Sequence, residues 1–327
     1  HGPHPNFQTE WWYYTGNLET DAGRRFGYQL TFFKRALVPP DQGKSRTSNW
    51  AADQVYMAHF AVTDAEDNTH RAFERFSRGA AGLAGAQGSP YRVWLEDWTV
   101  VQIGDRSGTV EMRAGQEDFA VDLRLDDQKG PILQGDRGYS RKGPAPGNAS
   151  FYYSQTRLRT RGTVRSGGAT FAVSGWSWMD HEFSTSALAS DQVGWDWFAL
   201  QFDDGTELMV FQIRQSNGAI DPYSSGTFIR ADGSARRLDV DDFALEVGDT
   251  WRSPTSGSSY PSRWTIRVPS IDLVLRVEPT MANQELNVSY TYWEGAVDIE
   301  ADRAGQPLEG VGYVELTGYA SSMQEQF

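Results

Sequence analysis

The amino-acid sequence predicts an all-β protein made of two antiparallel units, on three observations. Short runs rich in β-branched and aromatic residues alternate in polarity along the chain. No long segment has the 3.6-residue periodicity of an amphipathic helix. A weak internal repeat divides the chain into two similar halves. Many short strands of this kind are typical of a β-barrel or a β-sandwich.

Strand signals run through the chain and are separated by turn signals. The clearest strand signals lie at residues 28–33, 55–62, 91–101, 109–112 and 119–125. Asp204-Gly205 and Asp232-Gly233 are typical of tight hairpin turns. Residues 79–88 are rich in Ala and Gly without an apolar face, and residues 140–147 contain a Gly/Pro cluster. We expect both stretches to be loops.

The internal repeat defines the two units. An aromatic-rich hairpin signal opens each half, at residues 10–33 and 195–213. A similar strand signal closes each half, at residues 171–180 and 311–319, and a small, polar linker signal follows Phe183. The expected domains are residues 1–185 and residues 186–327.

Composition excludes several classes of partner. The formal charge is −13, from 43 acidic against 30 basic residues, which argues against nucleic acid or an anionic membrane surface. Aromatic residues make up 13% of the chain and include 12 Trp, so much of the apolar burial must come from rings. Such rings fill barrel cores and line pockets for apolar ligands. We therefore expect an apolar small-molecule ligand.

The compartment is only weakly indicated. There is no Cys, which excludes disulfides and thiolate metal sites. No run reaches the roughly 18 apolar residues that a membrane-spanning helix needs. The chain begins at His1 with no Met, so we expect a mature periplasmic or secreted chain, with a boundary of the expressed sequence as the alternative. The oligomeric state is not predicted.

The aromatic and acidic segment at residues 176–182 is the most informative motif. On a strand, Trp176, Trp178 and Asp180 share one face because successive side chains alternate. A carboxyl group between two indoles loses water, which raises its pKa. We expect Asp180 to be a general acid, with both rings contacting the substrate. The alternative is a structural Asp180 that caps the junction or pairs with an Arg.

Further aromatic and polar residues are expected at the ligand. Glu10, Trp12 and Tyr14 share one face of the opening strand, where they line a cavity or, alternatively, form core rings with a Glu salt bridge. An apolar strand holds His59, which is either a ligand contact or a satisfied buried histidine. The expected substrate-binding residues beyond Trp176 and Trp178 are Glu10, Trp12, Tyr14, His59, Trp195 and Trp197.

Sequence signals for a metal or a cofactor are weak, and we expect neither. The five His include His1-x-x-His4 at the terminus, which we expect to be frayed. No Gly-x-Ser-x-Gly elbow, Walker motif or Gly-x-Gly-x-x-Gly loop is present. A serine hydrolase, a metallohydrolase and a nucleotide-binding protein are therefore disfavoured.

Several segments together resemble a known family, the lipocalin-like carotenoid 1,2-hydratase (hydroxyneurosporene synthase) and AttH family. They lie at residues 1–18, 152–158, 175–182, 195–198 and 310–319. The resemblance covers nearly the whole chain. It implies two lipocalin-like antiparallel β-barrel domains packed together, with a ligand cavity near their junction.

The resemblance also implies roles for single residues. Carotenoid hydratases add water to a terminal isoprenoid double bond, and their proposed acid is an Asp two residues after an aromatic. Asp180 matches that position, with Trp178 where the hydratases carry Tyr. Their other implicated pair, a His and a Trp, falls near Phe151 and Tyr153, so this chain lacks that His and is closer to the AttH-like branch. Apart from the resemblance, the residues themselves lead us to expect that Tyr153 orients water or passes a proton. Alternation places His181 on the opposite face from Asp180, where we expect it to be a hydrogen-bonding partner from the adjoining domain.

These inferences lead to one function and one alternative. The first is a cofactor-free enzyme that acts on an apolar, isoprenoid-like or polyketide-like molecule by acid-catalysed protonation of an alkene, followed by hydration or cyclisation. Its catalytic residues are Asp180, Tyr153 and His181. The alternative is a non-catalytic exported carrier of a lipid-like ligand.

Overall fold

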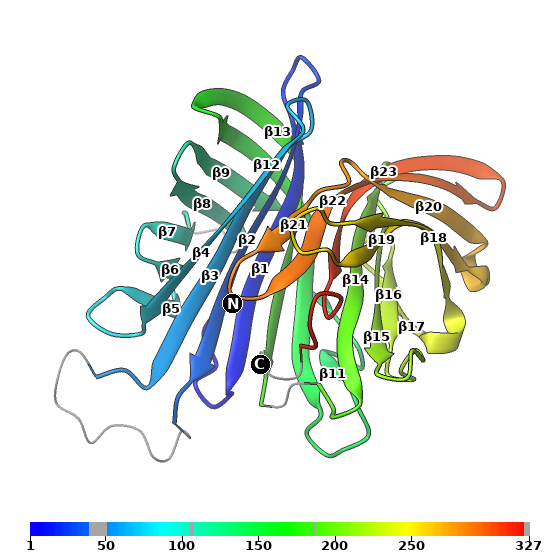
Figure 1. Ribbon diagram of the computed structural model, residues 1–327, viewed down its shortest axis with the longest axis horizontal. Helices are drawn as coiled ribbons and strands as arrows, with labels where there is room; N and C mark the ends of the chain where they lie inside the picture. Colours follow the sequence, from blue (N-terminus) through cyan, green and yellow to red (C-terminus); the bar gives the residue numbers. More distant parts are fainter. Residues whose placement is uncertain (39–50, 105–107, 186–187, 324–327) are drawn as a thin grey trace. The chain divides into compact units, whose positions relative to one another are not determined.

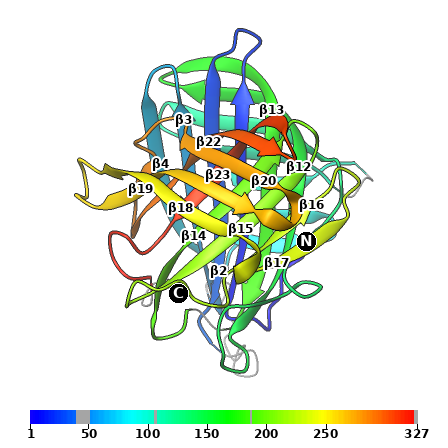
Figure 2. The ribbon, with the colours of Figure 1, turned by 90° about the vertical axis from the view of Figure 1, so that its right-hand side faces the viewer.

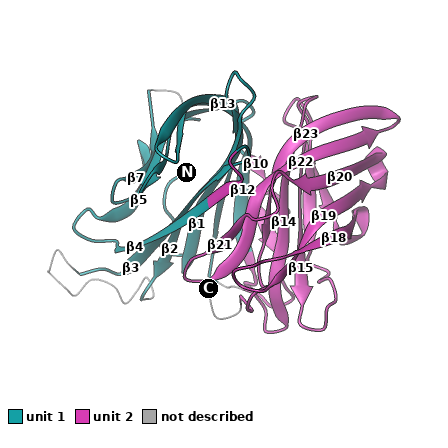
Figure 3. Ribbon diagram, turned by 45° about the horizontal axis from the view of Figure 1, so that its top comes forward, with its two compact units in different colours: residues 1–66, 71–131, 150–186 teal, residues 67–70, 132–149, 187–327 magenta. Residues whose placement is uncertain are grey.

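The computed structural model describes residues 1–38, 51–104, 108–185 and 188–323. The chain divides into two compact units (Figure 3). The first unit comprises residues 1–66, 71–131 and 150–186, and the second comprises residues 67–70, 132–149 and 187–327. The predicted linker contains residues 186 and 187, which lie outside the described residues.

The first unit is built on a curled antiparallel sheet (Figure 1). Its strands follow one another in space in the order β4-β3-β2-β1-β13-β12-β9-β8-β7-β6-β5. Their bounds are β1 (Thr9–Glu19), β2 (Arg25–Ala36), β3 (Gln54–Asp64), β4 (Thr69–Arg78), β5 (Ala84–Gly88), β6 (Tyr91–Leu95), β7 (Trp98–Gln102), β8 (Thr109–Gln116), β9 (Phe119–Asp127), β12 (Ala149–Ser166) and β13 (Ala169–Ser184). Two short strands, β10 (Ile132–Leu133) and β11 (Tyr139–Arg141), lie in the segment 132–149.

The second unit has a curled antiparallel sheet of its own, whose strands except β21 are labelled in Figure 2. Their order in space is β17-β16-β15-β14-β23-β22-β20-β19-β18, and β21 pairs with β22. The bounds are β14 (Gln192–Phe202), β15 (Glu207–Gln215), β16 (Ser225–Ile229), β17 (Ala235–Asp239), β18 (Ala244–Arg252), β19 (Ser259–Val268), β20 (Leu273–Pro279), β21 (Glu285–Asn287), β22 (Thr291–Arg303) and β23 (Gln306–Leu316). Two single-turn 3₁₀ helices occur at Val240–Asp242 and Pro269–Ile271.

The two sheets share a topology. In each, the opening strand pairs on one side with the next strand of the chain and on the other side with the closing strand: β1 with β13, and β14 with β23. The segment that precedes the closing strand, β12 or β22, then pairs with it as a hairpin. The predicted all-β fold is confirmed, and the described part of the chain contains no α-helix.

The structure contains the two predicted hairpin turns, and it differs from two other local predictions. Asp204-Gly205 connects β14 to β15 and Asp232-Gly233 connects β16 to β17, as predicted, with positive φ at both glycines. The expected loop at 79–88 is wrong at its end, because β5 pairs there with β6. The strand signal at 91–101 is interrupted between β6 and β7 by Glu96, which adopts a left-handed φ of 57°.

Each sheet encloses a core of aromatic and aliphatic side chains. In the first unit Trp12, Tyr14 and Leu18 belong to this core and are 0–3% exposed. We call the face of the first sheet that carries these three side chains its inner face, and the opposite side its outer face. In the second unit Phe198 and Leu200 belong to the equivalent core. Burying such a large apolar side chain stabilises a fold by about 1.5–3 kcal/mol. Within the described residues, no helix has the length and apolar character needed to cross a membrane.

Candidate functional site

The three residues predicted to be catalytic lie on two faces of the first sheet. In the register of the sheet, Asp180 stands opposite Tyr13 on β1, whereas His181 stands opposite Trp12. Because side chains alternate along a strand, His181 shares the inner face with Trp12 and Asp180 lies on the outer face. Tyr153, which is paired with His181, is also on the inner face. Asp180 therefore does not form one site with Tyr153 and His181.

The Asp180 carboxyl group is enclosed by neutral hydrogen-bond donors. Tyr152 Oη donates to Oδ2 at 2.6 Å, and Ser154 Oγ donates to Oδ1 at 2.5 Å. Trp178 Nε1 also donates to Oδ1, at 2.7 Å. Asp180 is only 4% exposed. Trp178, whose indole was predicted to contact a ligand, thus donates a hydrogen bond to the Asp180 carboxyl group.

Burial controls the protonation of Asp180. It raises the pKa of the carboxyl group to about 7, against the hydrogen bonds from Ser154, Tyr152 and Trp178, which favour the ionised form. The charge of Glu182 raises the pKa further. An ion pair with an Arg was one of the two forms of the structural alternative, and Asp180 forms none among the described residues, where its partners are Tyr152, Ser154 and Trp178. At neutral pH a large fraction of this carboxyl group carries its proton.

Two other predicted residues, Trp176 and His59, lie on the same face of the sheet as Asp180. Trp176, two positions before Trp178, is half-buried, and the Arg157 guanidinium lies 5.1 Å from the centroid of its ring. His59 on β3 is connected to Asp180 through the paired positions Tyr13 and Thr31, so it lies on the same outer face. It is fully buried, and its Nε2 is 3.0 Å from Glu74 Oε1, as expected of a satisfied buried histidine. Burial lowers its pKa, against the effect of Glu74.

The two residues that the resemblance aligned with the hydratase pair, Phe151 and Tyr153, do not contact Asp180. The groups that contact Asp180 are Tyr152 and Ser154. A shift of one residue moves a side chain to the other face of a sheet, so the two pairs cannot be exchanged. Both pairs alternate along β12, and only the register with β13 distinguishes them.

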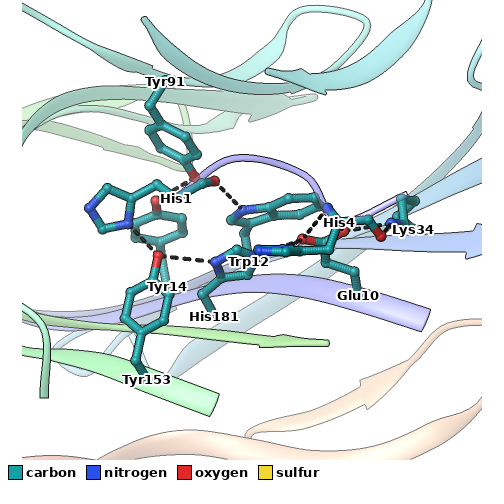
Figure 4. Close-up of polar contacts among 9 residues, drawn as sticks. All are labelled: His1, His4, Glu10, Trp12, Tyr14, Lys34, Tyr91, Tyr153 and His181. Atoms are coloured by element: carbon teal, nitrogen blue, oxygen red, sulfur yellow. Dashed lines mark hydrogen bonds and ion pairs between the residues drawn. The ribbon is translucent and has the colours of Figure 1, made fainter. Parts of the chain in front are cut away.

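A second cluster of titratable groups lies on the inner face and centres on Glu10 (Figure 4). Lys34 Nζ is 2.5 Å from Glu10 Oε2, and both side chains are fully buried. His181 Nε2 lies 2.8 Å from Oε1 of the same carboxylate. His4 contacts it twice, through its backbone N–H at 2.9 Å and its Nδ1 at 2.9 Å. The sequence alternative of a Glu salt bridge in the core is therefore found, with Lys34 as the partner that sequence reasoning missed.

The charges in this cluster follow from its contacts. Burial opposes ionisation of Glu10, but hydrogen bonds from His181 and His4 and the charge of Lys34 hold its pKa well below the usual range. Burial lowers the pKa of His181 to about 4, although contact with Glu10 acts in the opposite direction. At neutral pH Glu10 is ionised and His181 is a neutral imidazole.

Aromatic side chains surround this inner cluster. The Trp12 ring stacks on His181 with centroids 5.0 Å apart. His181 Nδ1 is 3.0 Å from Tyr153 Oη, and Tyr14 Oη is 2.9 Å from Tyr91 Oη. Glu10, Trp12 and Tyr14 thus share one face, as the alternation predicted, and Tyr153 joins them through His181.

The N-terminal segment is ordered against the cluster, so the expected fraying is wrong. The His1 ring contacts Tyr153 Oη through Nδ1, and the His1 carbonyl accepts a hydrogen bond from Trp12 Nε1 at 3.2 Å. His4 stacks on Phe183 with centroids 3.6 Å apart. Aromatic packing and hydrogen bonds to buried groups hold this segment in place.

Three of these residues could in principle ligate a metal ion. His4, Glu10 and His181 each offer one ligand atom, and these atoms lie within 4.8 Å of one another. However, Lys34 Nζ already places a positive charge 2.5 Å from the Glu10 carboxylate. A divalent ion beside this ammonium group would add uncompensated charge to a buried site. We therefore describe the cluster as a hydrogen-bonded network.

Two predicted ligand contacts belong to the second unit. Trp195 and Trp197 lie on the face of β14 opposite to Phe198, which is in the core. Trp195 Nε1 donates to Glu315 Oε2 at 2.7 Å, and Trp197 is 6% exposed. Trp195 therefore forms a hydrogen bond within its own sheet, and Trp197 is buried.

The sequence model of the AttH-like family matches residues 1–319, and the chain belongs to this family. The chain is similar to the crystal structure of a protein provisionally assigned as AttH from Nitrosomonas europaea. The two share 35% sequence identity at a TM-score of 0.85, over 97% of this chain and 94% of that one.

More distant relatives carry names of enzymes. The structure of kievitone hydratase from Nectria haematococca matches at a TM-score of 0.74 and 14% identity, over 98% of this chain and 91% of that one, which shows a shared fold. The dehydratase asqC of Emericella nidulans is 21% identical over 223 residues. That match spans 65% of this chain and 62% of the length of the dehydratase.

Proposed function

We propose that this protein is an acid catalyst that adds water to, or removes water from, an apolar isoprenoid-like or polyketide-like molecule without a cofactor. Asp180 is the proton donor. Family membership and the hydratase and dehydratase named among its relatives support the reaction class. Cyclisation of the same cationic intermediate is the variant in which an internal nucleophile takes the place of water.

The observation that carries this proposal is the environment of Asp180. Three other buried carboxyl groups pair with cations: Glu10 with Lys34, Asp64 with Arg24, and Asp196 with Arg214. Glu285 is also bound by neutral donors, but its hydrogen bonds hold its pKa below the usual range. Asp180 is instead enclosed by two hydroxyl groups and an indole N–H. A carboxyl group with a pKa near 7 is both protonated at neutral pH and acidic enough to give the proton up.

The proposed step is balanced in atoms and charge. The Asp180 carboxylic acid transfers its proton to one alkene carbon, and a new C–H bond forms as the π bond breaks. The positive charge on the other carbon is captured by the oxygen of a water molecule, which then returns a proton to the carboxylate. The reverse sequence is a dehydration. Trp176 and Trp178 share the face of Asp180, and a cation over an indole gains on the order of 2 kcal/mol when desolvated.

Turnover in D₂O tests the proposal. Small molecules retained by the purified chain are identified by mass spectrometry, and isoprenoid alkenes and polyketide enones are then offered in D₂O. Wild-type protein is expected to add one carbon-bound deuterium per turnover, and Asp180→Asn to lose this activity by about 10²-fold or more. Unchanged turnover in Asp180→Asn removes Asp180 from the chemistry. Retention of ligands without any product favours the carrier alternative.

The pH profile gives a second readout. The acid form of Asp180 is lost as pH rises through its pKa of about 7, so the rate should fall over that range. A rate that rises through pH 7 would point to a general base in place of this acid.

A further inference from the structure

Tyr153 stands at the end of a chain of hydrogen bonds that begins at a buried carboxylate. Glu10 Oε1 contacts His181 Nε2 at 2.8 Å, and His181 Nδ1 contacts Tyr153 Oη at 3.0 Å (Figure 4). The His181 and Glu10 side chains are fully buried, whereas Tyr153 is half-buried. This series of hydrogen bonds lies on the inner face of the sheet. It shares no residue with Asp180 and its hydrogen-bond donors on the outer face.

The direction of each hydrogen bond is fixed by the charges. Glu10 is ionised beside Lys34, so its oxygens only accept, and the proton of His181 must be on Nε2. A neutral imidazole has a single N–H, so its Nδ1 accepts the hydrogen of the Tyr153 hydroxyl group. The Tyr153 oxygen can therefore only accept a hydrogen bond from any further partner, through its lone pairs.

The side chain of His1 occupies that remaining position. Its Nδ1 contacts Tyr153 Oη, which requires Nδ1 to be the donor. The ring centroid is 5.4 Å from that of Tyr153 and 5.5 Å from that of Tyr91. A flat ring with a hydrogen-bond donor on its edge, held between two tyrosines, is the arrangement found there.

We propose that this position is a ligand site for a flat apolar ring that carries a hydroxyl donor, a phenol or an enol, which binds in place of the His1 ring. The ligand hydroxyl donates to Tyr153 Oη. His181 and Glu10 are positioning residues. They hold the Tyr153 hydroxyl hydrogen in a hydrogen bond to His181, so the site prefers ligands that donate a hydrogen bond over ligands that can only accept one. The site goes beyond the proposed function, since it lies on the opposite face of the sheet from Asp180.

Phenol and anisole test the site, because the two rings differ in whether the oxygen can donate. Affinities are measured by ligand-observed NMR titration of the 327-residue chain and of its His1→Ala variant. Removing the His1 ring should tighten phenol binding. Phenol should bind His1→Ala more tightly than anisole by roughly fivefold, the value of one hydrogen bond. Equal affinity for the two probes, or no binding of either to His1→Ala, overturns the proposal.

Further variants made in the His1→Ala background show which residues cause the preference for phenol over anisole. Tyr153→Phe should abolish the preference for phenol, and His181→Phe should abolish it by releasing the Tyr153 hydrogen so that anisole gains affinity. A purely structural role of His181 would weaken both probes equally, which also contradicts the proposal. If Tyr153→Phe does not fold, His181→Phe decides the question.

Two controls separate this site from other effects. Tyr28→Phe removes a buried hydroxyl of the same sheet that donates to Ser177 at 2.7 Å, and it should keep the preference for phenol. Asp180→Asn should keep it too. Loss of turnover in Asp180→Asn with an unchanged phenol preference supports both proposals, and each can fail without the other.

Discussion

Asp180 and His181 are consecutive in the chain, and their side chains lie on opposite faces of one sheet. Burial favours the neutral form of both groups, which raises the pKa of Asp180 to about 7 and lowers the pKa of His181 to about 4. One strand therefore supplies a weak acid to the outer face and an uncharged imidazole to the inner face. Strand alternation alone produces two chemically distinct environments from adjacent residues.

Asp180→Asn should stabilise the protein above pH 7. The folded-state pKa of about 7 lies above the ordinary pKa of 3.8 of an exposed Asp, so the folded state binds the proton more tightly than the unfolded state does. Stability is consequently lost as pH rises from about 4 to about 7, by a total on the order of 4 kcal/mol. The variant lacks this loss, because an amide carries no charge and can still accept from Trp178. Urea unfolding from pH 4 to pH 8 measures the effect, and parallel pH profiles of the two proteins would contradict it.

The sequence was sufficient to predict the fold because its signals are local. Alternation of apolar and polar residues depends on neighbours two positions apart, and the hairpin at Asp204-Gly205 depends on its own two residues. The failures at 79–88 and 91–101 are likewise local, since small residues and Glu96 gave no clear turn or strand preference.

The candidate site was less predictable because it depends on register. β12 and β13 shift register between Gln155 and Leu158, and this irregularity cannot be read from the sequence of either strand. Lys34 was missed although a signal existed: it follows Phe32 by two residues and so falls on the inner face. A charged residue at a core position predicts a buried partner, and Glu10 occupies the paired position on β1.

Lys34→Met should destabilise the protein by about 3–5 kcal/mol, because it leaves the buried Glu10 carboxylate without its cation. The double variant Lys34→Met/Glu10→Gln should recover much of this loss, since no uncompensated charge remains. Chemical unfolding of both single variants and the double variant forms a double-mutant cycle.

An exposed ion pair provides the control for this cycle. Arg113 Nε lies 3.1 Å from Asp122 Oδ2, with side chains 61% and 58% exposed. Arg113→Met should cost less than about 1 kcal/mol. If Lys34→Met lowered the free energy of unfolding by no more than Arg113→Met does, burial would not strengthen the ion pair between Lys34 and Glu10.

His181 should be a neutral Nε2–H imidazole at pH 7 and should titrate near pH 4. Its folded pKa lies below the ordinary histidine pKa of 6.5, so its contribution to stability is present above pH 6.5 and is lost as pH falls toward 4. Long-range ¹H–¹⁵N correlation spectra of ¹⁵N-histidine-labelled protein report both the tautomer and the titration. A proton on Nδ1, or a midpoint near pH 6.5, would contradict the hydrogen-bond directions assigned to Glu10 and Tyr153.

Glu315→Gln should leave catalysis within about twofold of wild type, whereas Asp180→Asn should lower it by 10²-fold or more. Glu315 lies on β23, the closing strand of the second unit, and accepts a hydrogen bond from Trp195 much as Asp180 does from Trp178. The two carboxyl groups differ in their surroundings, because Glu315 is half-buried whereas Asp180 is buried among neutral donors. An acid needs a raised pKa, which strong desolvation gives to Asp180, so the repeated aromatic–carboxyl pattern alone should not confer activity. Deuterium incorporation by both variants makes the comparison, and equal losses would mean that the pattern acts through folding in both units.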